Sequence, residues 1–209
     1  MKPRQQGFTL LEIMIVLSVL GVLLALVGSV LVGTQKALLK AQRYTTSLDE
    51  IHAAQQFLRT SLAQVLPMQI KLEGRDRAGI FYGSAQRLTF VASLPGQLGG
   101  GIRRYSLALH DAADEHNLQV SFAQLSKTDD GTAYQPWGQP QVLIPGVRQL
   151  RFAYRGTTPE GQPTGWLSEW PWPRRLPRLV RIECQNNGPV PWVTEVLALR
   201  LDLASGANL

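Results

Sequence analysis

The hydrophobic and polar positions divide this chain of 209 residues into parts of different character. Residues 13–33 form an uninterrupted apolar run that contains no charged side chain. At about 1.5 Å per residue, a helix of this length covers the roughly 30 Å hydrocarbon core of a bilayer. Because Leu, Ile and Val dominate the run, we expect it to form a membrane-spanning helix.

The helical pattern continues beyond Gly33, but polar residues now interrupt it. Apolar residues recur at spacings of three, four and seven, namely Tyr44, Leu48, Ile51, Leu58, Leu62 and Val65. This spacing predicts one apolar face of an amphipathic helix, which Pro67 should end. The sequence therefore predicts a single helix from about Thr9 to Leu66, apolar all round in its first half and amphipathic in its second.

After Pro67 the apolar residues alternate with polar ones, which predicts half-buried antiparallel strands. Connecting turns are expected at residues 111–117 and 127–131, and the Pro- and Trp-rich stretch 156–177 should be irregular. We expect the amphipathic part of the helix to pack on the apolar face of the sheet, which gives an α+β fold. The predicted strands are residues 88–91, 104–109, 118–123, 150–155, 180–184 and 192–202.

Composition excludes several kinds of protein. The formal net charge is +6, but the basic residues are scattered, so a nucleic-acid-binding surface is not expected. Cys184 is the only cysteine, so no intrachain disulfide can form. It alternates in phase with Val180 and Ile182, which predicts a buried structural thiol.

Sequence motifs for a catalytic or ligand-binding site are weak. Gly99, Gly100 and Gly101 are not followed by a Lys-Ser or Lys-Thr pair, so a loop is expected there rather than a phosphate cradle. The acidic groups Asp111/Asp114/Glu115 and Asp129–Asp130 do not match an EF-hand loop and are predicted to be solvated turns; calcium binding in the body stays an open alternative. We expect no catalytic residues, no metal, no cofactor and no small-molecule substrate.

The N-terminus carries the most specific pattern. A secretory signal would have a shorter apolar core followed by small residues, and a plain signal anchor would not explain Glu12 at the edge of the apolar run. A carboxylate inside a membrane helix costs free energy and needs a partner. The segment Gly7-Phe8-Thr9-Leu10-Leu11-Glu12 closely resembles the type III signal of type IV prepilins and type II secretion pseudopilins.

The resemblance implies that a membrane-embedded aspartyl prepilin peptidase cuts between Gly7 and Phe8, and that Phe8 is then N-methylated. It implies that Glu12 neutralises the terminal ammonium of Phe8 on a neighbouring subunit during assembly. Residues 1–7 would be the leader, 8–33 the transmembrane and filament-core helix, 34–67 its amphipathic continuation, and 68–209 a globular domain. Because Lys2 and Arg4 favour the cytoplasmic side, we expect a single-pass inner-membrane protein with its body in the periplasm.

A second resemblance concerns the body. The run from Phe57 to Pro67, the pairs Gly165-Trp166 and Trp170-Pro171, and Leu176-Pro177 resemble minor pseudopilins of the J class in type II secretion. The chain departs from that pattern at Ser61, where an Asp is common, and at Met68, where a basic residue is usual. The resemblance implies a tip complex with the I and K classes, the H class being a further candidate, beside the major pseudopilin. That complex would initiate the periplasmic pseudopilus that helps export folded proteins.

Two other functions stay open at this stage. A minor pilin of a type IV pilus, serving adhesion or motility, would share the same leader and anchor. A membrane-tethered periplasmic enzyme would need a concave site with perturbed acids, bases or nucleophiles, for which the sequence gives no indication.

Trp166, Trp170 and Trp172 are the most distinctive residues of the body. They are predicted either to form an exposed contact with another subunit or to cap one end of the sheet core.

Overall fold

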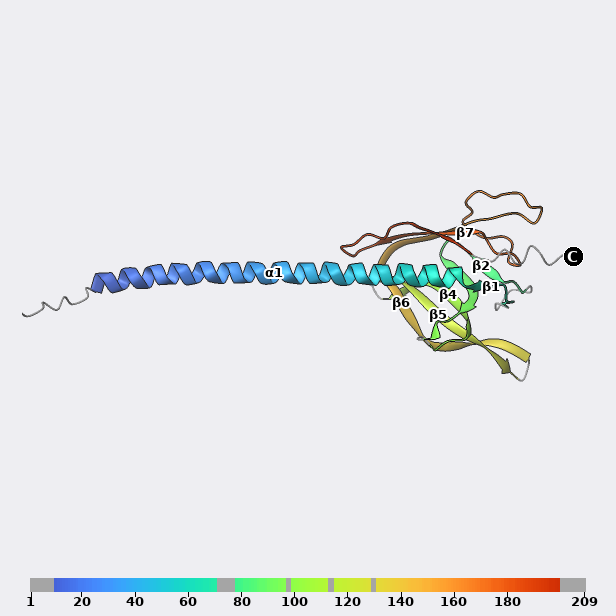
Figure 1. Cartoon of the computed structure of the whole chain (residues 1–209), viewed down its shortest axis with the longest axis horizontal. Helices are drawn as coiled ribbons and strands as arrows, with labels where there is room; N and C mark the ends of the chain where they lie inside the picture. Colours follow the sequence, from blue (N-terminus) through green and yellow to red (C-terminus); the bar gives the residue numbers. More distant parts are fainter. Residues whose placement is uncertain (1–9, 71–77, 97–98, 113–114, 129–130, 200–209) are drawn as a thin grey trace, which may run out of the picture. The chain divides into compact units, whose positions relative to one another are not determined.

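The computed structural model describes residues 10–70, 78–96, 99–112, 115–128 and 131–199. The chain divides into two compact units, Met1–Thr46 and Ser47–Leu209, each of which is described by itself. Helix α1 (Leu10–Ala63) supplies the described part of the first unit and the first element of the second. The strands, all in the second unit, follow in Figure 1.

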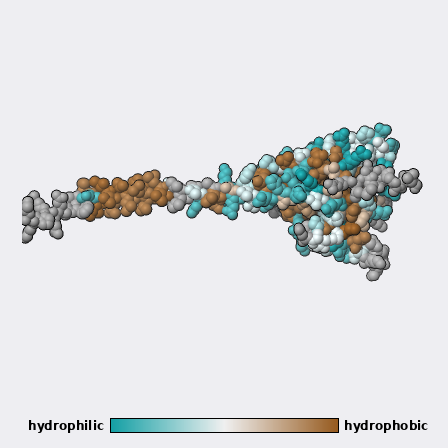
Figure 2. Space-filling view, viewed as in Figure 1, coloured by the Kyte–Doolittle hydropathy of each residue, from teal (hydrophilic) through white to brown (hydrophobic). Residues whose placement is uncertain are grey.

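The apolar run of the first unit is helical and carries apolar side chains on all sides. α1 is continuous through residues 13–33, as predicted, and the large apolar side chains described there, from Ile13 to Val27, are exposed. Figure 2 shows the described side chains of this stretch as a brown surface. Within the described residues, α1 is the helix whose length and composition suit a membrane crossing. The hydroxyls of Ser18 and Ser29 donate to the carbonyls of Met14 and Leu26, both at 2.7 Å, so the helix itself satisfies these polar groups.

The helix ends three residues before the predicted Leu66. Its last residue is Ala63, and Val65 and Leu66 form the short strand β1 (Val65–Leu66) instead. The residue before a proline is biased away from helical conformation, so Pro67 favours an extended Leu66. Pairing of β1 with Ala92 and Val91 then places Val65 in the core at 2% exposure.

The strands form one antiparallel sheet. Along it lie β1, β3, β4, β5, β6, β7 and β8 in that order, while β2 also pairs with β3, which makes eight strands in the described residues. The order follows the chain almost throughout, so the sheet is a meander built from hairpins. The bounds are β2 (Phe81–Gly83), β3 (Arg87–Ser93), β4 (Ile102–Ala112), β5 (Glu115–Thr128), β6 (Gly131–Arg155), β7 (Leu179–Asn186) and β8 (Glu195–Ala198).

Five of the six predicted strands lie inside β3 to β7, with the predicted alternation. The last prediction was too long: β8 covers Glu195–Ala198 and residues 200–202 lie outside the described part. The two predicted turns were also too long. β4 ends at Ala112 and β5 begins at Glu115, so the first turn is confined to the residues between them. β5 ends at Thr128 and β6 begins at Gly131, which shortens the second turn in the same way. The β5–β6 ladder shifts register between Val120 and Phe122, opposite residues 138–140, where Pro140 cannot donate a ladder hydrogen bond. The stretch 156–177 is irregular apart from isolated bridges, as predicted.

The core of the second unit lies between α1 and one face of the sheet. Ile51, Ala54, Leu58 and Leu62 of the helix are at most 6% exposed and pack on the alternating apolar residues of the strands. The predicted packing of helix on sheet is therefore confirmed. Tyr44 does not join this face: it belongs to the first unit and is 50% exposed. The buried sheet residues of this core are Val65, Phe81, Leu88, Phe90, Ala92, Tyr105, Leu107, Leu118, Val120, Ile144, Val147, Leu150, Phe152, Tyr154, Val180, Ile182, Cys184 and Leu197.

The Leu58→Ala variant tests this packing. Leu58 is 1% exposed, so the substitution should leave a cavity and lower the free energy of unfolding by about 2–5 kcal/mol. Urea unfolding of a soluble fragment that begins at Gln35 measures the change. The control, Leu125→Ala, removes a side chain that is 48% exposed and should change stability by about 0.5 kcal/mol or less. Equal losses in both variants would contradict the placement of the core.

Candidate functional site

Glu12 lies in the first turn of α1 and is exposed. A carboxylate is favourable there because the helix macrodipole places partial positive charge at the helix N-terminus. Gly7 and Phe8, the predicted cleavage and methylation positions, lie outside the described residues. Glu12 therefore stands at the start of a long apolar surface, where an ionised group is strongly attracted to a positive charge nearby.

The three tryptophans of the irregular stretch have different surroundings. Trp170 is 4% exposed, and its ring Nε1–H donates to the carbonyl of Arg175 at 2.8 Å. Its ring meets that of Trp172 edge to face, with centroids 4.9 Å apart, and Trp172 is partly buried against the core. Trp166 is also partly buried, and the guanidinium of Arg181 lies 4.6 Å from its ring centroid. Trp170 therefore caps the core, the second of the two predicted roles. Trp166 and Trp172 remain partly accessible at the surface.

Backbone hydrogen bonds hold this loop against the outer edge of β2. The carbonyl of Pro173 accepts from the N–H groups of Ile80 and Phe81, at 2.6 and 3.1 Å, and the N–H of Trp170 donates to Gly83 at 2.9 Å. Space is also limiting here, because a Cβ added at Gly156 would come within 2.7 Å of the Trp170 ring. The position of the loop is therefore set by backbone hydrogen bonds to the sheet edge and by close packing around Trp170.

The remaining candidate residues are dispersed. The carboxylate of Asp111 accepts a hydrogen bond from Nδ1–H of His116, 2.7 Å away, on the exposed β4–β5 hairpin. Asp114, Asp129 and Asp130 lie outside the described residues. The described residues contain no group of three His, Cys, Asp or Glu side chains suited to hold a metal ion. Gly99, Gly100 and Gly101 have positive φ angles in the connection between β3 and β4, so they form a loop, as predicted.

Cys184 lies on the core face of β7, as predicted, with 8% exposure. Burial raises the pKa of its thiol to about 11. The thiol is therefore protonated near neutral pH, which suits a structural role rather than a reactive one.

Arg181 and Arg175 are site residues that the sequence analysis did not identify. The alternation of β7 places Arg181 on the outward face, out of phase with Val180 and Ile182. Its stacking on Trp166 has no local sequence signal, since the two residues belong to different segments. The backbone carbonyl of Arg175 accepts the hydrogen bond from Trp170. Every residue has such a carbonyl, so the residue type at this position could not predict the contact.

The amino-acid sequence matches known protein families over most of its length. Residues 2–28 match the family model of the prokaryotic N-terminal methylation motif, and residues 29–199 match the model of type II secretion system (T2SS) protein J. The chain belongs to the type II secretion system protein J family. It is similar, at 30% identity over 213 residues, to the type II secretion system protein J of Xanthomonas campestris pv. campestris, with 99% of each chain covered.

Membership of this family defines the role of the chain. The chain is a minor pseudopilin of a type II secretion system, a structural subunit that works with other subunits of the pseudopilus. The apolar helix and the methylation motif together indicate a single membrane anchor. The J-class resemblance predicted from the body is thereby confirmed.

Substitution of the tryptophans should separate structural from surface roles in this pseudopilin. Trp170→Ala should lower the free energy of unfolding by about 3–5 kcal/mol, because it empties a buried site and removes the bond to Arg175. Trp166→Ala should cost only about 1 kcal/mol, the loss of a partly exposed cation–π contact. Urea unfolding of the fragment from Gln35 measures both. A larger loss for Trp166→Ala would show that the loop's core anchor has been misassigned.

Proposed function

We propose that this pseudopilin is part of the complex at the tip of the pseudopilus, together with I- and K-class subunits. The H class is a further candidate member, and the major pseudopilin would follow below. The carrying observation is Glu12 in the first turn of α1, in a chain that matches protein J over residues 29–199. Retention of this acid suggests a subunit with another above it in the filament, because the topmost K-class subunit commonly lacks the acid.

The N-terminal chemistry follows from the same assignment. Prepilin peptidase cuts between Gly7 and Phe8, and Phe8 is methylated as the new first residue; the match to the methylation motif over residues 2–28 supports this. The cut precedes the apolar helix, so the anchor is retained. Lys2 and Arg4 of the leader hold the N-terminus in the cytoplasm, which puts the body in the periplasm and the anchor in the inner membrane.

In this mechanism, Glu12 pairs with the terminal ammonium of Phe8 on the neighbouring subunit. Removal of charges from water is costly, but a pair at short range in a low-dielectric core recovers much of that cost. A subunit in the wrong register would leave both charges without that neighbour. The charge pair therefore contributes mainly to the specificity of assembly, because it favours one axial position of each subunit's helix relative to the helix of its neighbour.

The loop at residues 156–177 is our proposed subunit contact in the body. Trp166 and Trp172 are partly accessible, and tryptophan is enriched where interfaces gain most of their affinity. Trp170, at 4% exposure, supports the contact from inside by fixing the shape of the loop.

Gly7→Ala tests the cleavage position. The variant should accumulate with its leader attached, since a side chain at the residue before the cut interferes with the peptidase. Intact-mass measurement of the protein purified from membranes distinguishes the precursor from a mature chain that begins at methylated Phe8. Gln5→Ala, a change elsewhere in the leader, should be processed normally. A mature mass for Gly7→Ala would refute this cleavage site.

Glu12→Ala tests the charge pair. The variant should be cleaved and folded normally, yet full-length I- and K-class subunits should co-purify with it roughly tenfold less or worse, because loss of one partner of a buried pair costs about 3–5 kcal/mol. Secretion should fall in parallel.

Two controls accompany Glu12→Ala. Ser18→Ala removes a hydroxyl that bonds within the helix and should leave co-purification unchanged. The fragment from Gln35 lacks Glu12 and should still bind the partner bodies, which tests the tip complex separately. Unchanged co-purification and secretion in Glu12→Ala would argue against the charge pair.

A further inference from the structure

After removal of the leader, the basic residues nearest the anchor all follow its apolar run. Lys2 and Arg4 belong to the leader, and no Lys or Arg occurs between Phe8 and Gln35. The next charged residues are Lys36, Lys40 and Arg43, and the next acid along the chain is Asp49. Three positive charges therefore stand together, without an intervening acid, where the apolar run has just ended.

These three residues, here called the basic face, point to one side of α1. They are exposed and spaced by four and three residues in a continuous helix. At about 100° per residue, they fall within an arc of about 60°. Leu38 points to the opposite side and is 64% exposed, and Leu39 is 55% exposed. Basic side chains that directly follow a membrane-spanning run are suited to the lipid headgroup layer, because their long arms place the charge at the interface.

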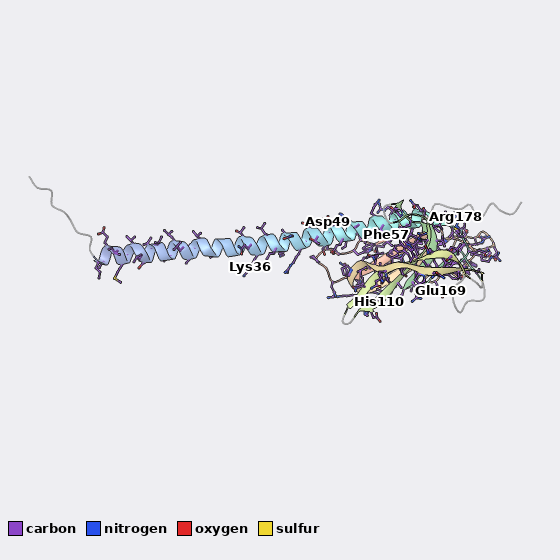
Figure 3. The ribbon with its side chains drawn as sticks, turned by 90° about the horizontal axis from the view of Figure 1, so that it is seen from below. Lys36, Asp49, Phe57, His110, Glu169 and Arg178 are labelled. Atoms are coloured by element: carbon purple, nitrogen blue, oxygen red, sulfur yellow. The ribbon has the colours of Figure 1, made fainter. Side chains whose placement is uncertain are left out.

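The axial position of the basic face matches the headgroup layer. With Gly33 at the end of the apolar run, Lys36 lies about 4.5 Å and Arg43 about 15 Å further along the helix axis. Helical side chains lean toward the helix N-terminus, and the long arms of Lys and Arg extend further in that direction. Their charged ends therefore reach back toward the phosphate layer, which begins just outside the hydrocarbon core. Figure 3 labels Lys36 and, further along the same helix, Asp49.

We propose that the basic face binds the phosphate groups of anionic phospholipids in the leaflet nearest the globular body. This inference rests on the membrane-spanning placement of the anchor in the proposed function. Phosphodiester groups lie at the depth that the basic face reaches. An acidic surface of another subunit has no such depth requirement.

The binding has a mechanical consequence. The ordinary positive-inside bias would place basic residues at the other end of the helix, and processing removes the two that stood there. In the mature subunit, the basic face then fixes the depth of the anchor by its hold on lipid phosphate. Entry into the filament must break these contacts, so anionic lipid retains subunits in the membrane until partners compete for them.

Native mass spectrometry of the mature full-length chain in detergent micelles tests the proposal, with dioleoylphosphatidylglycerol and dioleoylphosphatidylcholine as probes. The wild type should retain more phosphatidylglycerol than phosphatidylcholine. Lys36→Gln/Lys40→Gln/Arg43→Gln should lower that preference roughly tenfold or more, because each cation near a lipid surface contributes about fivefold to binding. The matched control, Arg87→Gln/Arg151→Gln/Arg155→Gln, removes three exposed cations of the body and should keep the preference.

Three kinds of outcome would overturn the inference. An unchanged preference in the Lys36/Lys40/Arg43 variant, or an equal loss in the control, would show that the basic face does not bind lipid. Displacement of the lipid by inorganic phosphate alone would indicate a general anion site. Unchanged lipid binding with lost co-purification of other pseudopilins would make the basic face a protein contact. Failure of the tip-complex assignment would appear in co-purification of the wild type and leave the lipid measurement unaffected.

Discussion

One unbroken helix, α1, must suit two different surroundings, an apolar medium in its first part and a protein core in its last. The rest of the structure depends on this constraint. Every backbone group inside α1 is bonded within the helix, so the chain can pass from an apolar medium to a protein core without exposing peptide groups. Only the side chains change along its length. They are apolar on all sides in residues 13–33, and they are apolar on one side from Ile51 to Leu62.

Periodicity in the sequence reveals the elements that bury a regular face. The spacing of Ile51, Leu58 and Leu62 and the alternation of Val180, Ile182 and Cys184 each reported a real core face. The same reasoning failed at Tyr44, which continues the helical spacing but stands before the sheet begins to cover the helix. Spacing predicts which residues share a side, whereas burial depends on whether another element reaches that far.

Contacts without periodicity could not be predicted. The Arg59 guanidinium lies 3.0 Å from the Glu195 carboxylate across 136 residues of sequence, and neither residue type nor spacing signals the pair. The position of Trp170 depends on the carbonyl of Arg175 and on Gly83, and backbone partners leave no sequence pattern. The N-terminal signal is different in kind. It is a short run of residue types in the sequence itself, which is why residues 2–28 match the methylation motif without any knowledge of the fold.

The loop that lies along β2 has a consequence for how such subunits can associate. An open strand edge invites another chain to add a strand, which leads to indiscriminate growth. Here the Pro173 carbonyl and the Trp170 amide occupy hydrogen-bonding groups of that edge, and the flanking prolines Pro171 and Pro173 have no N–H to offer an incoming strand. Neighbours approaching this side must recognise side chains instead of backbone.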